Sequence, residues 1–204
     1  MSEALSRRTE RRSRQRAANR SAILEAARRV AAREGAGDLS LRAVAAEAGY
    51  APASVYEYFR NRAELVLALA ADDMGSLARA LRETAAARGE APGALAAAAK
   101  TAFDMLRASG ALPAAAATLE GADAPAEAER LFNGKLIGAL TAFAEAAGLG
   151  RVTHRDDQAD VVLAAAAITG LAVLARAGRL KTLGLEESVL LERLDKRFAL
   201  AIGA

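Results

Sequence analysis

Hydrophobic and polar positions along the chain recur with the period of α-helices almost throughout. Apolar residues return at i+3 and i+4, and no segment shows the alternation that is typical of a half-buried β-strand. Gly and Pro interrupt this pattern in short clusters, at 33–38, 87–93, 108–113, 120–125, 146–151 and 177–184. The sequence therefore predicts an all-α protein.

The first two predicted helices have clear end signals. A helix from about 17 to 34 carries one apolar stripe, and Gly35 is suited to end it. Ser40 is placed to cap a second helix over 41–48. Gly49 is expected to end that helix, because a sharp turn needs a left-handed residue there.

A third short helix and a longer fourth one follow. Pro52 suits the first position of a helix that runs to about Phe59. Asn61 and Glu64 have the spacing of a capping box at the start of the longer helix. Two short helices joined by a Gly-containing turn, behind a supporting helix, predict a helix-turn-helix that places its second helix in the DNA major groove.

All three tyrosines of this aromatic-poor chain lie within 48–65. Val55 and Phe59 are four residues apart and are expected to face the core, which leaves Tyr56 and Tyr58 for DNA. A tyrosine ring packs along the sugars while its hydroxyl bonds to phosphate. The alternative is that the rings only fill a small core, and for Phe59 that is the expected role.

Charge divides the chain in two. Residues 1–62 hold 13 Lys and Arg against 7 Asp and Glu, a net charge of +6, whereas the remainder has 15 against 18, a net charge of −3. Seven arginines fall within 7–20. We expect residues 1–16 to form a basic, disordered arm, residues 17–62 a DNA-binding domain, and residues 63–204 a separate helical domain.

The stretch from Arg20 to Leu69 resembles the TetR family of bacterial transcriptional repressors. The resemblance rests on "AILEAA", "LSLRAVAAEAG", "ASVYEYF" and "NRAEL" at fixed spacing. It implies a three-helix DNA-binding domain, a fourth helix leading into an all-helical ligand-binding and dimerisation domain, and repression relieved by a small molecule. The positions that it assigns to DNA are Ser40, Arg42, Ala51, Pro52, Ala53, Ser54, Tyr56, Tyr58 and Arg62.

Three of these positions depart from the family's usual residues. Ala51 replaces a common serine and Ala53 a common glycine, so this edge has lost polar groups. Arg62 stands where the family usually has a phosphate-binding lysine, and it offers a fork of donors in place of a point charge.

The second domain is expected to contain helices near 94–108, 125–147, 157–177 and 186–202. In the last helix, an apolar seam is formed by Leu191, Leu194, Phe198 and Ala201. The resemblance implies that the last two helices of each subunit make a four-helix homodimer interface; the alternative is that both are internal core. Candidates for lining a ligand cavity are Phe103, Met105, Leu106, Phe132, Leu136, Thr141 and Phe143.

Catalytic chemistry finds little support in the sequence. The chain has no cysteine, no Gly-rich phosphate loop and one histidine, His154, which lies beside Asp156 and Asp157. We read His154 as part of a solvated loop, with metal binding as the weaker alternative. We expect no enzyme activity, no cofactor and no metal.

The expected function is that of a cytoplasmic, dimeric regulator that binds a palindromic double-stranded operator and responds to a small-molecule effector. Two alternatives stay open: a sequence-neutral DNA-packaging protein, and an enzyme or small-molecule carrier with a fused basic arm. The apolar run 161–175 is too short and too rich in Ala and Gly to span a bilayer comfortably, so we expect no membrane contact.

Overall fold

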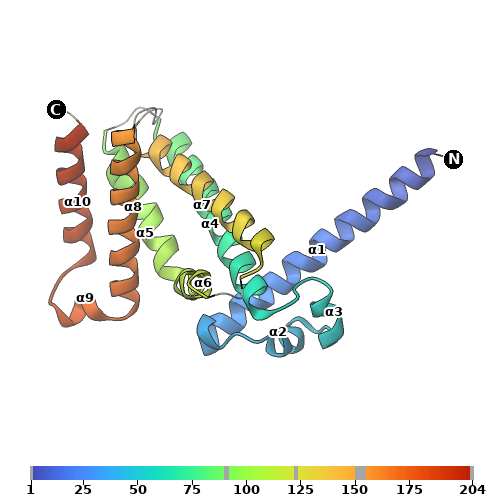
Figure 1. Ribbon diagram of the computed structural model, residues 1–204. Coiled ribbons are helices and arrows are strands. Elements are labelled where there is room, and N and C mark those ends of the chain that lie inside the picture. Colours follow the sequence, from blue (N-terminus) through green and yellow to red (C-terminus); the bar gives the residue numbers. More distant parts are fainter. Residues whose placement is uncertain (1, 90–91, 122–123, 150–154, 203–204) are drawn as a thin grey trace. The chain divides into compact units, whose positions relative to one another are not determined.

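The computed structural model describes residues 2–89, 92–121, 124–149 and 155–202, and within these ranges the chain is helical and contains no β-strand. This confirms the all-α prediction (Figure 1). The elements in chain order are α1 (Ser2–Glu34), the 3-10 helix η1 (Ala36–Asp38), α2 (Leu41–Ala48), α3 (Pro52–Tyr56), α4 (Arg62–Arg88), α5 (Ala94–Ala108), α6 (Ala111–Leu119), α7 (Ala126–Ala146), α8 (Arg155–Arg176), α9 (Arg179–Thr182) and α10 (Glu187–Ile202).

The chain divides into two compact units. The N-terminal unit comprises residues 1–70 and 110–129, and the C-terminal unit comprises residues 71–109 and 130–204. This division differs from the expected boundary after residue 62. The first turns of α4, where Leu65 and Leu69 are buried, group with the N-terminal unit, and so does α6.

The basic arm differs from the disordered segment that the charge pattern suggested. Residues 2–16 continue α1 as one uninterrupted helix of 33 residues. This stretch contains no Gly or Pro, and six of its 15 residues are Arg, which is a good helix former. An ion pair between Arg14 and Glu10, 3.3 Å apart at i,i+4 spacing, adds local support.

Small residues allow close helix packing in the C-terminal unit, where α5 packs against α8 and α10, and α8 against α10. On α5, Ala98, Ala102 and Phe103 are buried. Arg107 on α5 donates to both carboxylate oxygens of Glu187 on α10, at 3.1 and 3.2 Å. This pair ties the start of the last helix to the core of the unit.

Two short helices were not predicted: α6 begins within the Gly/Pro cluster 108–113, and α9 lies within the cluster 177–184. Pro113 lies in the first turn of α6, where backbone N–H groups have no intrahelical partner, so the ring breaks no hydrogen bond there. The four residues of α9 follow Gly178, whose φ of 69° makes the turn after α8. Proline and glycine therefore shape these ends without excluding helix between them.

Candidate nucleic-acid interface

The core of the N-terminal unit holds α2 and α3 in place. On α1, Ile23, Ala27 and Val30 are completely buried, and this helix packs against α2. Val55 of α3 and the following Phe59 are also buried, at 0 and 1 % exposure. The expected core roles of Val55 and Phe59 are confirmed.

Local end signals set the geometry of the turn between α2 and α3. The Ser40 hydroxyl accepts a hydrogen bond from the backbone N–H of Ala43 at 3.1 Å, which caps α2 as predicted. Gly49 ends α2 with a left-handed φ of 72°. The N–H of Tyr50 then bonds back to the carbonyl of Ala45 at 2.9 Å, so the chain reverses tightly before α3.

The third helix is short. It starts at Pro52, as predicted, but ends at Tyr56, three residues earlier than expected. The chain stays coiled beyond it, because the N–H groups of Tyr58 and Phe59 both bond to the carbonyl of Val55 at 3.0 Å. Residues 52–59, called the recognition segment below, thus consist of the short helix α3 and a following turn in which Phe59 is buried.

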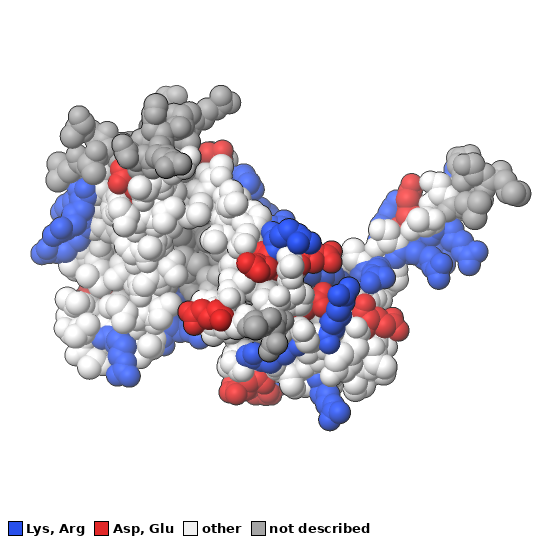
Figure 2. All heavy atoms as spheres, in the orientation of Figure 1, with Lys and Arg blue, Asp and Glu red and all other residues white. Residues whose placement is uncertain are grey.

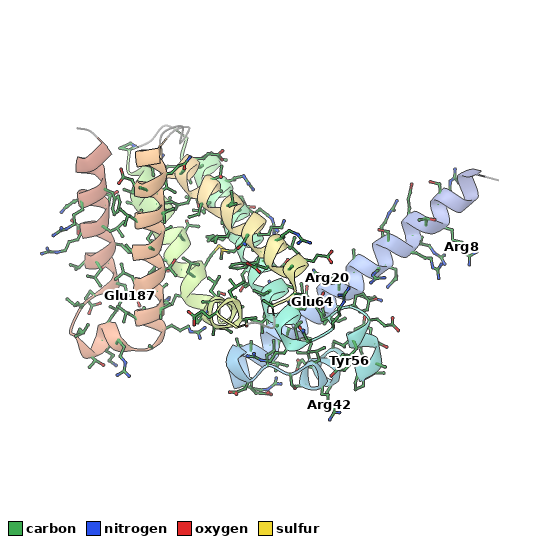
Figure 3. The ribbon with its side chains drawn as sticks, in the orientation of Figure 1. Arg8, Arg20, Arg42, Tyr56, Glu64 and Glu187 are labelled. Carbon is green, nitrogen blue, oxygen red and sulfur yellow. The ribbon has the colours of Figure 1, made fainter. Side chains whose placement is uncertain are left out.

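Most residues that the resemblance assigned to DNA are exposed on the starts of α2 and α3. This exposed edge is formed by Ser40, Arg42, Ala51, Pro52, Ala53 and Tyr56. Tyr56 is 49 % exposed, and Ser54 beside it is half-buried. Figure 3 shows Arg42 extending away from α2. The arrangement presents small apolar groups flanked by a cation and a phenol.

Tyr58 is placed differently from the other predicted contacts. It is half-buried, and its hydroxyl accepts a hydrogen bond from Nδ2 of Asn19 at 3.1 Å. The guanidinium of Arg16 lies 5.6 Å from the centre of the Tyr58 ring. Tyr58 therefore joins the end of the recognition segment to α1, a bracing role that needs Asn19, 39 residues away, and that the local pattern did not reveal.

Arg62 also has intramolecular partners. Its Nη2 donates to the carbonyl of Ala36 at 3.1 Å and to the carbonyl of Gly37. Both acceptors belong to η1, so this guanidinium ties the start of α4 to the connection between α1 and α2. Phosphate binding by Arg62 stays a prediction, and it requires the side chain to share or exchange these bonds.

Ion pairs centred on Glu47 join α1 to α2 in the N-terminal unit. Glu47 on α2 accepts from Arg29 at 2.7 Å and from Arg33 at 3.1 Å, and both donors lie on α1. The hydrogen bond from Arg29, followed by that from Arg33, lowers the pKa of Glu47, and the bond that Arg33 donates to Glu47 raises the pKa of Arg33. These pairs lock α1 to the face of α2 that carries Glu47.

The start of α4 is capped as predicted. Oδ1 of Asn61 accepts from the N–H of Glu64 at 2.8 Å, and the Glu64 carboxylate accepts from the N–H of Arg60 at 2.8 Å. The reciprocal bond reaches one residue further back than in the usual capping box. The link between the recognition segment and α4 is thereby held by two local bonds.

The C-terminal unit contains an apolar cavity of about 60 Å³. Three of the seven predicted residues, Leu106, Leu136 and Phe143, line it. Phe103 and Phe132 are buried elsewhere, Met105 is half-buried, and Thr141 is exposed. Other residues that line the cavity were not predicted from the sequence: Met74, Leu77, Leu81, Ala102, Ala139, Leu140, Ala165, Ile168 and Thr169.

His154 lies outside the described residues. Within the described ranges, no three His, Cys, Asp or Glu side chains are grouped so that they could hold a metal ion.

Residues 23–69 match the sequence family described as bacterial regulatory proteins, tetR family. The match spans the end of α1, the helix-turn-helix and the first turns of α4. No curated protein matches the chain at a significant level.

Solved structures share the fold of most of the chain. A TetR transcriptional regulator from Rhodococcus sp. RHA1 is 17 % identical with a TM-score of 0.66, covering 91 % of this chain and 96 % of its own. A TetR-family regulator from Streptomyces coelicolor is 21 % identical with a TM-score of 0.61, covering 92 and 97 %. The transcriptional regulator FadR from Bacillus subtilis, solved in complex with stearoyl-CoA, is 20 % identical with a TM-score of 0.59, covering 87 and 96 %.

Proposed function

Because the chain belongs, through its N-terminal domain, to the TetR family of bacterial regulatory proteins, we propose that this DNA-binding transcriptional regulator is a repressor that an effector releases from a palindromic operator. Members of this family bind DNA as dimers and bind small-molecule effectors. A regulator of this kind acts on the chromosome, so we place it in the cytoplasm. Neither the packaging protein nor the enzyme or carrier is favoured by any observation on the described residues.

The exposed edge of α2 and α3 carries the proposal. Its centre is Ala51-Pro52-Ala53, and small apolar groups contact thymine methyls better than guanine edges. Arg42 and Tyr56 flank this centre and are exposed for contact with phosphates or base edges. We therefore expect part of the operator preference to rest on thymine methyl contacts.

A competition experiment tests this function. The protein is incubated with genomic fragments, and retained fragments are then challenged with excess random DNA. A specific regulator holds one palindromic fragment; a packaging protein loses every fragment equally. Replacing contacted thymines in the retained fragment by uracil should weaken binding, and full tolerance of uracil at every position would contradict the proposed readout.

A second copy of this chain is the proposed partner of α8. Residues at i, i+3, i+4 and i+7 spacing on this helix are apolar or small and exposed: Val162, Leu163, Ala166, Ala167, Gly170, Val173 and Leu174. Contrary to the expectation that the apolar run 161–175 is too short, the longer segment Gln158–Arg176 is long and apolar enough to cross a bilayer by length and composition. Such segments also occur as core helices of soluble proteins. Burial against a second copy removes this stripe from water without a membrane.

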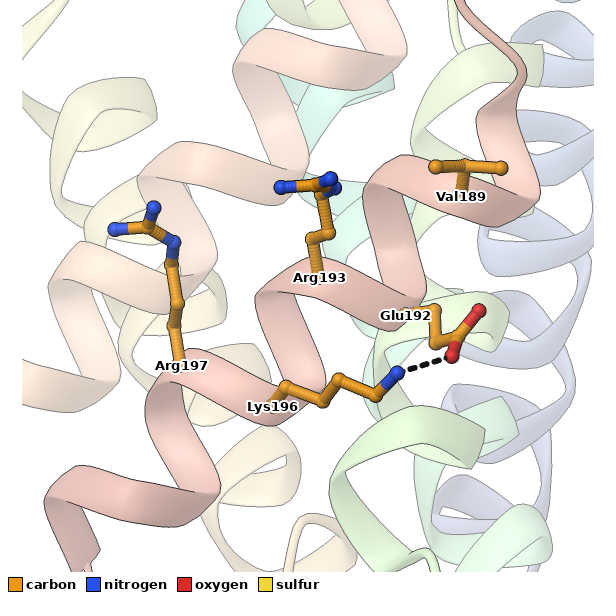
Figure 4. Close-up of a pocket in the computed structure, with 5 residues that line it drawn as sticks. All are labelled: Val189, Glu192, Arg193, Lys196 and Arg197. Atoms are coloured by element: carbon orange, nitrogen blue, oxygen red, sulfur yellow. Dashed lines mark hydrogen bonds and ion pairs between the residues drawn. The ribbon is translucent and has the colours of Figure 1, made fainter.

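The predicted seam of the last helix is partly buried within its own subunit. Leu194 is 7 % exposed, and Leu191 and Phe198 are half-buried, so their part in the dimer interface stays a prediction. Ala201 lies among residues whose side chains are not described. The outward side of α10 borders an open hollow lined by Val189 and four charged residues, where Lys196 pairs with Glu192 (Figure 4). We assign this side to the polar rim of the dimer interface.

The dimer is tested by charge insertion. Leu163→Glu and Val173→Glu each place a carboxylate in the α8 stripe, where a dimer would bury it unpaired. We expect light scattering to show monomers for these variants. Ile137→Glu, at a residue of α7 that is 64 % exposed, is the control and should stay dimeric. Dimeric variants at both α8 positions would contradict the assignment.

The proposed effector is a largely apolar molecule. The cavity lining includes no charged residue, and the hydroxyl of Thr169 already donates to the carbonyl of Ala165 at 2.7 Å. Pockets for drug-sized ligands measure roughly 300–1,000 Å³, so the 60 Å³ cavity must widen to admit one. The similar fold of FadR with stearoyl-CoA bound supports an effector with an acyl or comparable apolar chain.

Widening gives the effector a physical route to the DNA-binding domain. Met74, Leu77 and Leu81 line the cavity from α4, and the first residues of the same helix belong to the N-terminal unit. A ligand that displaces α4 therefore favours one conformation of the chain, typically with a coupling of ~1–3 kcal/mol. By reciprocity, operator DNA must weaken ligand binding by the same factor. A tight cavity ligand that leaves operator affinity unchanged would contradict this regulation.

A further inference from the structure

The first half of α1 is an exposed helix. Burial of α1 begins at Ile23, whereas every residue from Ser6 to Ala18 is exposed. At a rise of ~1.5 Å per residue, these 13 residues extend the helix by roughly 20 Å. Burial in a core therefore does not explain why this part of α1 is present, and its exposed side chains are the candidates for a function.

Some of the arginines of this extension form one stripe along α1. Arg8, Arg12, Arg16 and Arg20 recur every fourth residue and so form one slowly turning stripe. Arg14 points about 120–160° away from Arg8 and Arg12, and it pairs with Glu10. Figure 2 shows basic side chains collected along one edge of the projecting helix. Among the described residues, Arg8, Arg11 and Arg12 make no hydrogen bond or ion pair.

The stripe is continuous with the recognition segment. Arg16 donates to the carbonyl of Glu57 at 3.5 Å and lies over the ring of Tyr58. Arg20 lies 5.1 Å from the centre of the Phe59 ring. The inner two arginines thus contact the end of the DNA-facing segment, and the outer ones lead away from it along α1. Figure 3 shows Arg8 near the far end of this helix.

We propose that Arg8, Arg11 and Arg12 bind the sugar–phosphate backbone of DNA beyond the half-site that α3 reads. The proposal rests on the DNA-binding function above, and two features support it: the charge complements a polyanion, and the stripe adjoins the recognition segment. Guanidinium groups suit phosphate because their forked donors can bind two oxygens. A helix holds the three side chains in fixed register, so the extension lengthens the footprint without reading bases.

The expected effect follows from counterion release, which contributes a salt slope of about −0.9 for each neutralised phosphate. Arg8→Gln with Arg12→Gln removes four arginines per dimer, so the slope should become shallower by up to about 3.6. Affinity at low salt should fall at least ten-fold for an operator with 10-bp flanks, and much less for one trimmed to its half-sites. Arg14→Gln with Arg82→Gln is the matched control, because both residues are exposed arginines outside the stripe.

The test measures fluorescence anisotropy of the full chain on flanked operator, trimmed operator and random DNA, with circular dichroism to verify helix content. An unchanged slope and affinity on the flanked operator overturns this proposal and leaves the proposed function standing. If the wild-type protein shows no preference for the operator over random DNA, the proposed function is wrong. If the double variant nevertheless has a shallower salt slope on random DNA, the phosphate role of the stripe holds. Loss of binding to anionic lipid vesicles with unchanged DNA binding assigns the stripe to a membrane surface, and overturns the proposal.

Discussion

Two tyrosines two residues apart are expected to do different work, and removing one hydroxyl at a time separates them. Tyr58→Phe keeps the ring under Arg16 but removes the oxygen that accepts from Asn19 at 3.1 Å. Tyr56→Phe removes a hydroxyl on a side chain that is 49 % exposed and that has no hydrogen-bond partner among the described residues. The same atom is deleted in both variants, so the comparison isolates its surroundings.

The magnitudes follow from those surroundings. A neutral, half-buried hydrogen bond contributes about 1 kcal/mol to the free energy of unfolding, which for a chain of this size lowers Tm by roughly 2–4 °C. Tyr56→Phe should change the free energy of unfolding by less than about 0.5 kcal/mol. In the DNA complex, a Tyr56 hydroxyl bonded to phosphate contributes about 1.5 kcal/mol, or roughly ten-fold in affinity per half-site.

Thermal melting followed by circular dichroism measures the first quantity, and fluorescence anisotropy on the operator measures the second. We expect Tyr58→Phe to melt earlier and to bind operator normally at a temperature where it is folded. Tyr56→Phe should melt normally and bind weakly. If both variants lose operator affinity equally with no change in Tm, the bracing role assigned to Tyr58 is wrong.

Three further variants probe the turn, the ion pairs and the cavity. Gly49→Ala meets no atom within 4 Å but forces alanine into a left-handed φ, so we expect a loss of about 1–2 kcal/mol in chemical denaturation. The pKa of Glu47 is lowered in the folded state, so its pairs stabilise the fold above about pH 4.5 and fade as pH falls through the folded pKa; the destabilisation caused by Glu47→Gln at pH 7 should shrink in acid melts. Ala139→Leu adds three carbons to the 60 Å³ cavity and should weaken an effector at least ten-fold in thermal-shift titrations, with operator affinity unchanged.

The geometry of the helix-turn-helix was predictable because its determinants are local. Ser40, Gly49, Pro52 and Asn61 each act on backbone groups within a few residues, so their type and spacing suffice to place the helix ends. The later helices were predictable for a similar reason, except where Pro113 was taken as a break. A proline is tolerated in the first turn of a helix but breaks a helix interior, so the pattern around Pro113 fits either a helix start or a helix break.

The cavity was only partly predictable because it depends on which helices meet. The sequence analysis selected large side chains on predicted helices, and Leu106, Leu136 and Phe143 do line the cavity. Phe103 and Phe132 have the same character, yet they are buried elsewhere in the chain. Helical periodicity predicts that a residue faces the interior. It does not predict which other helix that residue contacts, because this depends on how the helices pack together.

Contacts between residues far apart in sequence also leave few polar groups at the recognition segment free for DNA. Of the polar groups expected to hold DNA, Tyr58 is engaged with Asn19 and Arg62 with the carbonyls of η1. Ala51 and Ala53 offer no hydrogen-bonding side chain at all. Attraction to phosphate then depends on few exposed cations beside the recognition segment, such as Arg42 and Arg60. Electrostatic attraction supplies much of the affinity of most DNA-binding proteins, so an edge this apolar needs cations from elsewhere. We propose that the helical run of arginines that starts at the end of the same segment provides them, without altering the bases that α3 is proposed to read.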